Sequence, residues 1–155
     1  MPAVSFTRPA DTTAYAAGDL VANSTTAGSV APVALQGAVE AGGPRLIRRL
    51  KLRKSGTGVS NASFRVHLYS TSPTAANGDN AAWSTSGVAG YLGALDVTID
   101  RAFTDGAAGF GVPVAGSEIT VDAAGAIFAL VEARAAYTPV SAEVFTLELD
   151  APLVV

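Results

Sequence analysis

The sequence predicts an all-β fold, a β-sandwich of the jelly-roll type with about eight strands and at most one short helical turn. Apolar and polar residues alternate with a period of two along much of the chain, as half-buried strands require. Clusters of turn-forming residues separate these runs, and long amphipathic helices are absent from the pattern. A length of 155 residues suits one buried core, so we expect a single domain spanning residues 1–155.

Three segments carry the clearest strand pattern. In residues 64–69, the side chains of Phe64, Val66 and Leu68 alternate with polar neighbours and are expected to face inward. Residues 95–100 and 145–150 alternate in the same way. Weaker strand patterns cover residues 4–7, 19–22, 33–39, 46–53, 119–121 and 126–133. The last of these is almost continuously apolar, which indicates a central strand covered on both faces.

The connecting segments are rich in glycine and small polar residues. TDGAAGFG, residues 104–111, is typical of a turn, and residues 81–84 could form one helical turn capped by Asp79 or Asn80. Residues 1–18 are less regular and fit either an edge strand or an arm that reaches a neighbouring molecule.

Composition favours a folded protein with an asymmetric distribution of charge. Hydrophobic residues make up 49% of the chain and charged residues 15%, with a net charge of −3. Eight basic and three acidic residues lie up to Arg65, whereas two basic and ten acidic residues follow it. Such halves can pair with each other or present opposite faces to neighbouring subunits. Nucleic acid is a poor partner for a chain of this balance.

Several classes of chemistry lack their signatures. There is no cysteine, which excludes disulfides and thiolate metal sites. No apolar run reaches the roughly 18 residues of a membrane span, so we expect a soluble, unexported protein without a membrane partner. The sole histidine, His67, lies on the polar face of a predicted strand, and no G-x-S-x-G motif occurs. The 13 acidic residues could include a glycosidase pair, but they fit solvated or ion-paired positions better. We therefore predict no enzymatic activity and no cofactor.

Two further segments allow a binding role. NGDN, Asn77 to Asn80, has oxygen ligands suited to calcium, but it lacks the continuation of a calcium loop and is more typical of an ordinary turn, whose tip we expect to be open to a neighbour. Trp83, Tyr69 and Tyr91 could form an aromatic platform for sugars. Alternatively, Trp83 closes off the hydrophobic core.

The strongest candidate surface is the basic segment RLIRRLKLRK, residues 45–54. As a strand it places Leu46, Leu50 and Leu52 on one face with Arg48, and a cationic row on the other. Arginine pairs well with carboxylates at protein interfaces. The alternatives are an edge strand kept soluble by charge or a nucleic-acid site without interleaved aromatics. The candidate interface residues are Arg45, Arg48, Arg49, Lys51, Arg53 and Lys54.

Short motifs along most of the chain resemble a known family. The order AYAAGDLVA (14–22), a basic strand, NASFRVHLYSTSPT (61–74), DNAAW (79–83) and GYLGALDV (90–97) is similar to that of small proteins encoded beside the major capsid proteins of tailed bacteriophages. These resemble head cement or decoration proteins, whose known folds include jelly rolls and β-sandwiches. No catalytic or metal signature accompanies the likeness.

The resemblance implies a virion structural protein. It would be made in the cytoplasm of a bacterial host, bind the major capsid protein across subunit seams on the outer surface of the head, and form dimers or trimers there. The main alternative is a carbohydrate-binding β-sandwich module on a virion or cell surface, and a third is a structural protein of the tail or neck.

Overall fold

The structure is a computed structural model that describes residues 3–35, 44–114, 119–121 and 127–152. Fourteen short strands and two 3₁₀ turns occur in these residues. The strands are β1 (Ala3–Thr7), β2 (Leu20–Val21), β3 (Val33–Ala34), β4 (Arg45–Ile47), β5 (Arg49–Lys54), β6 (Ser63–Tyr69), β7 (Thr74–Ala75), β8 (Thr85–Ser86), β9 (Tyr91–Thr98), β10 (Arg101–Phe103), β11 (Gly106–Pro113), β12 (Ile119–Val121), β13 (Phe128–Ala133) and β14 (Val144–Asp150). The 3₁₀ turns are η1 (Ala27–Ser29) and η2 (Val88–Gly90).

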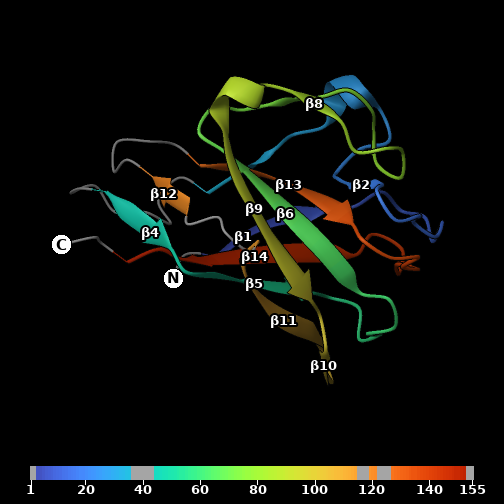
Figure 1. Cartoon of the computed structure of the whole chain (residues 1–155). Coiled ribbons are helices and arrows are strands. Elements are labelled where there is room, and N and C mark those ends of the chain that lie inside the picture. The colour runs from blue at the N-terminus through green and yellow to red at the C-terminus, as the bar shows by residue number, and fades with distance from the viewer. Residues whose placement is uncertain (1–2, 36–43, 115–118, 122–126, 153–155) are drawn as a thin grey trace.

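The all-β prediction is confirmed, and the strands form a curled antiparallel sheet (Figure 1). Its order is β1-β14-β5-β11-β9-β6-β13-β2, with β10 paired to β11 and β3 paired to β13. Strands β6, β9 and β11 follow one another across the sheet and β5 lies beside β11, which is a Greek-key order. Two small ribbons, β4 with β12 and β7 with β8, complete the pairing. The strand count exceeds the expected eight because several strands have only two or three residues.

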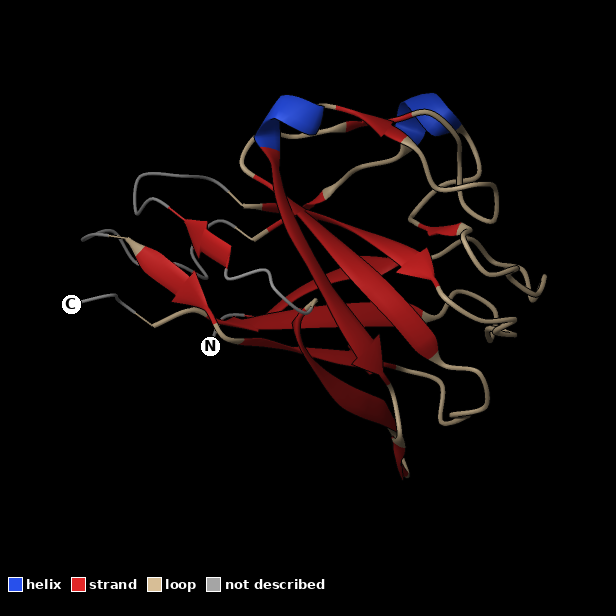
Figure 2. Ribbon diagram, in the orientation of Figure 1, coloured by secondary structure: helices blue, strands red, loops and turns tan. Residues whose placement is uncertain are grey.

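The curl brings the two ends of the sheet face to face around one core. Figure 2 shows β6 and β9 crossing in front of β5 and β14, and Phe64 of β6 meets Phe145 of β14 edge to face at a centroid distance of 5.4 Å. Phe64, Val66 and Leu68 are fully buried, as the alternation predicted. Burial of such side chains contributes about 1.5–3 kcal/mol each.

Strand β11 forms the corner of the curl. Its first half pairs with β5 and its last residues pair with β9, so Gly111 has a partner on both sides. A Cβ atom on Gly109 would collide with the backbone of Thr98, and one on Gly111 would collide with the carbonyl of Asp96. Glycine is therefore required for the close approach of β9 to β11. The prediction of a turn over residues 104–111 is wrong beyond Asp105, because these glycines belong to a strand.

Most expected strands are present with adjusted ends. Phe128–Ala133, within the predicted 126–133 segment, forms β13, which is covered on both faces as predicted. Within residues 1–18, Ala3–Thr7 forms the edge strand β1. The expected strand over 33–39 is seen as Val33–Ala34, and residues 36–39 lie outside the described residues. Residues 81–84 are not helical, because Ala82 forms a β-bridge with Asp19 and Asp79 is engaged elsewhere.

The basic segment divides at Arg48 into β4 and β5. The inward face shifts by one residue there: Ile47 is buried in β4, while Leu50 and Leu52 are buried in β5. The expectation that Leu46 shares the inward face with Leu50 is therefore wrong. Strand β5 also lies between β14 and β11, which rules out the edge-strand interpretation.

We predict that Gly109→Ala lowers the free energy of unfolding by about 2–3 kcal/mol, because the added methyl group forces β9 away from β11. Urea denaturation followed by circular dichroism measures this change. Gly58→Ala is the matched control, since a Cβ atom at Gly58 meets no atom within 4 Å. Equal midpoints for both variants would contradict the assigned role of Gly109.

Candidate functional site

A row of cations covers the outer face of β5. Arg49 and Arg53 are exposed and Lys51 is half-buried, alternating with the buried Leu50 and Leu52. The cations pair with carboxylates of the neighbouring strand β14: Arg49 lies 3.3 Å from Asp150, Lys51 lies 3.1 Å from Glu148, and Arg53 lies 3.9 Å from Glu148. The predicted cationic row is confirmed, but it is partly neutralised within the chain.

Lys54, the last residue of the basic segment, is not part of this surface. Its side chain is 1% exposed, and its Nζ donates to Glu143 Oε1 at 3.2 Å and to the Gly56 carbonyl at 2.9 Å. Tyr137 donates to both oxygens of Glu143, and burial, followed by the hydrogen bond with Glu143, raises the pKa of the Tyr137 hydroxyl. These contacts hold the 55–62 connection against the chain that precedes β14.

The two arginines at the start of the segment differ in exposure. Arg45 is half-buried in β4 and donates to the Ala151 carbonyl at 3.4 Å. Arg48 is exposed in the interruption between β4 and β5, and within the described residues no ion pair involves it. Arg49 and Arg53 are about equally exposed, at 52% and 51%, but both face carboxylates of β14, so Arg48 presents the most accessible charge of the six predicted residues.

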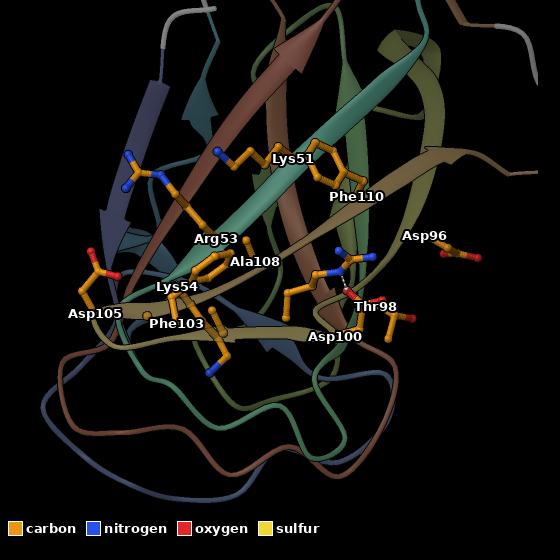
Figure 3. Close-up of a pocket in the computed structure, with 13 residues that line it drawn as sticks. Lys51, Arg53, Lys54, Asp96, Thr98, Asp100, Phe103, Asp105, Ala108 and Phe110 are labelled. Carbon is orange, nitrogen blue, oxygen red and sulfur yellow. Dashed lines mark ion pairs between the residues drawn. The ribbon is translucent and has the colours of Figure 1, made fainter.

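Beside the cationic row lies an open groove of about 760 Å³, which we call the outer groove. It is lined by Lys51, Arg53, Lys54, Asp96, Thr98, Asp100, Arg101, Phe103, Asp105, Gly106, Ala107, Ala108 and Phe110. Figure 3 shows Lys51 and Arg53 on one side of Phe110, with Asp96 and Asp100 on the other. We call the β5 side, with Lys51 and Arg53, the basic wall, and the side formed by β9 and the residues after it, with Asp96 and Asp100, the acidic wall; Arg101 and Asp105 also line the groove.

Exposed apolar side chains accompany this groove. Phe103 is 58% exposed, Phe110 is 56% exposed, and Val112, the next outward residue of β11, is 64% exposed. The Arg49 guanidinium lies 5.0 Å from the centre of the Phe110 ring. Neighbouring apolar and arginine side chains of this kind are typical of protein interaction surfaces. Sequence reasoning missed Phe110 because the turn assignment hid strand β11, and it missed Phe103 because the short strand β10 was not predicted.

The only histidine is enclosed on the opposite layer. His67 is 5% exposed; its ring stacks on Trp83 at 3.9 Å, and its Nε2 lies 3.4 Å from Glu132. Tyr91 is 3.0 Å from Nδ1. Burial lowers the pKa of His67, outweighing the opposing hydrogen bond with Glu132. The cluster attaches the 70–90 connection to the outside of β6.

The proposed aromatic platform is not assembled on one open face. Tyr69 is 1% exposed, while Tyr91 is 40% exposed. Trp83 packs on the second apolar cluster, formed by Leu20, Ala22, Ala75 and Leu130. Trp83 therefore covers a small apolar cluster on the outer side of β13. This agrees with the alternative prediction that Trp83 closes off a hydrophobic core.

The NGDN segment faces inward. Asp79 is 5% exposed, and its Oδ1 accepts hydrogen bonds from Tyr15 at 2.6 Å and from the Ala22 backbone at 2.8 Å. Its Oδ2 lies 3.3 Å from the buried Arg8 guanidinium. Burial raises the pKa of Asp79 despite these donors. Both carboxylate oxygens are engaged in tying the N-terminal segment to this loop, so the expectation of an open tip is wrong.

The part of the chain that the structure describes has neither a metal-binding group nor a membrane-spanning helix, and the chain matches no known family. In the described ranges, no group of three or more histidine, cysteine, aspartate or glutamate side chains is arranged to hold a metal ion. Nor does any described helix have the length and apolar character needed to cross a membrane. No protein-family model matches the chain, and no curated protein and no solved structure is significantly similar to it.

We predict that Asp79→Ala destabilises the protein by about 3 kcal/mol, because it removes the fully buried carboxylate that pairs with the buried Arg8. Thermal and urea denaturation measure the loss. Asp11→Ala is the control, since Asp11 also pairs with Arg8 but its side chain is 37% exposed, and solvent screening limits its effect to about 1 kcal/mol or less. Similar losses in both variants would argue against a special role for the buried pair.

His67 makes the stability depend on pH. Its folded pKa is lower than its unfolded pKa, so the unfolded chain takes up the proton first and stability falls as the pH drops through about 6.5. We expect the urea midpoint of the wild type to fall more between about pH 7.5 and 5.5 than that of His67→Gln, which keeps a polar side chain but does not titrate. Parallel midpoints in the two proteins would contradict this assignment.

Proposed function

We propose that this protein is a cement or decoration protein of a tailed-bacteriophage head. The observation that supports it best is the exposed surface on β5, β10 and β11, which presents Phe103, Phe110 and Val112 and has Arg49 over the Phe110 ring. Such a surface suits recognition of another protein rather than chemistry on a small molecule. The sequence resemblance to proteins encoded beside major capsid proteins points in the same direction.

In this proposal the capsid contact uses the accessible end of the basic segment. Arg48 and Arg49 present guanidinium groups that can pair with carboxylates of the major capsid protein. The half-buried Arg45 adds a further positive charge on β4, and the partly paired Lys51 and Arg53 extend the charge along β5. Lys54 is excluded from the contact by its burial.

The mechanism of such a protein is thermodynamic. A cement protein that binds the expanded shell, but not the dissociated subunits, adds its binding free energy to the stability of the shell. Many copies on one lattice gain further through contacts with one another, because each bound copy raises the effective concentration for its neighbours. We propose accordingly that the protein acts on the outer surface of the virion, self-associates there as a dimer or trimer, and is made in the host cytoplasm.

The test is to mix the purified protein with expanded capsids that lack it. We expect co-sedimentation with the capsids and increased resistance of the shells to heat. Arg48→Ala together with Arg49→Ala should weaken binding by about threefold to tenfold and reduce its dependence on salt, since these are exposed charges. No binding by the wild-type protein at any salt concentration would overturn the proposed function.

A matched control is Arg134→Ala. This arginine lies after β13, its side chain is 41% exposed, and it pairs with Glu132 away from the basic segment. We expect Arg134→Ala to bind like the wild type. Equal weakening by both sets of substitutions would show a general effect of net charge and remove Arg48 and Arg49 from the contact.

A further inference from the structure

The outer groove has a distribution of charge that no uniformly charged partner complements. Its basic wall carries Lys51 and Arg53, its acidic wall carries Asp96 and Asp100, and Phe110 lies between them (Figure 3). Each wall also has one charge of the opposite sign, Asp105 on the side of Arg53 and Arg101 beside Asp100, so the walls differ in their prevailing charge. An acidic partner would meet repulsion at one wall and a basic partner at the other. The matching surface must have carboxylates opposite β5, cations opposite β9, and apolar groups at its centre.

A second copy of the same surface satisfies these requirements. Strand β11 lies between β5 and β9. If two copies meet face to face about a two-fold axis that runs along β11, the basic wall of each copy faces the acidic wall of the other. Phe103, Phe110 and Val112 of both copies then meet at the centre and lose their exposure to water. Two-fold contacts of this isologous kind are the commonest in homo-oligomers.

Some charged side chains of the two walls are exposed and only weakly paired within their own chain, so they can form ion pairs with a second copy. Arg53 is 51% exposed, and its nearest carboxylate, Glu148, is 3.9 Å away. Asp100 is 64% exposed and lies 3.9 Å from Arg101. Asp96 is held more firmly, because Arg65 contacts both of its oxygens at 2.6 and 2.9 Å and, chiefly through this hydrogen bonding, lowers its pKa. Arg53 and Asp100 are therefore the pair most able to form a new contact.

We propose that the outer groove is the interface of a two-fold symmetric dimer, with Arg53 of each copy opposite Asp100 of the other and Phe110 at the centre. The proposal rests on the proposed function only for the expectation of self-association. The dimer is expected to form in solution, by the purified protein in the absence of capsids.

Sedimentation velocity across a range of protein concentrations tests the dimer. We expect the wild type to sediment as a dimer. Phe110→Ser should raise the dissociation constant of the dimer about tenfold or more, because it removes an apolar contact at the centre of the interface. Val88→Ser is the control, because Val88 is 89% exposed on η2, outside the groove. A monomeric wild type at every soluble concentration, or unchanged dimerisation of Phe110→Ser, would overturn the proposal.

Charge reversal tests the orientation. Arg53→Glu places two carboxylates opposite each other in its homodimer, and Asp100→Lys places two cations opposite each other, so each variant alone should dimerise about tenfold more weakly or worse. An equimolar mixture should recover wild-type association, because both contacts are again between opposite charges. Failure of the mixture to associate, with both variants folded by circular dichroism, would reject this orientation.

The two proposals fail separately. A wild type that is monomeric in solution but co-sediments with capsids would overturn the dimer and leave the proposed function standing. A dimer with the predicted charge dependence that does not bind capsids would overturn the proposed function alone.

Discussion

The close crossing of β9 and β11 determines the shape of this protein. Gly109 and Gly111 have no side chain, so the backbone of β9 can approach the inner side of β11 and pair with its end. The same strand pairs through its first half with β5. This shared strand turns one antiparallel sheet back on itself, which places Phe64 against Phe145 and encloses the core. An open, twisted sheet without such a corner would leave its inward-facing apolar side chains exposed to water.

The corner also explains where the candidate surface lies. Because the inward positions of β11 at the crossing are glycines, its bulky residues, Phe110 and Val112, are on the outer face. There they join the outward cations of β5, whose leucines fill the core. In β5 and β11, the inward residues of the alternating pattern pack the sandwich. The outward residues of the same two strands form the exposed apolar and charged surface on which the two proposals depend.

Ion pairs between distant segments of the chain fasten its loops and its last strand to this framework. Arg8 and Lys54, from the basic half, have buried contacts with Asp79 and Glu143 of the acidic half. Arg49 and Lys51 pair across strands with Asp150 and Glu148. Removing one member of a buried pair costs far more than losing an exposed pair, because the remaining charge stays desolvated. The asymmetry in the sequence is thus largely used within the fold, while Arg48 and the groove walls keep accessible charge.

The sequence by itself determined the all-β class, the central strand at residues 126–133 and the inward face of Phe64, Val66 and Leu68, because these depend on the period-two alternation of neighbouring residues. It also indicated the outward cations of β5, and it left open whether the two charged halves pair with each other or face neighbouring subunits. Only the tertiary structure decided that GAAGFG is a strand, that Asp79 and Lys54 are buried, and that Asp100 lies across a groove from Arg53. These features depend on which distant segments approach each other, and local patterns of glycine, asparagine or lysine carry no information about that approach.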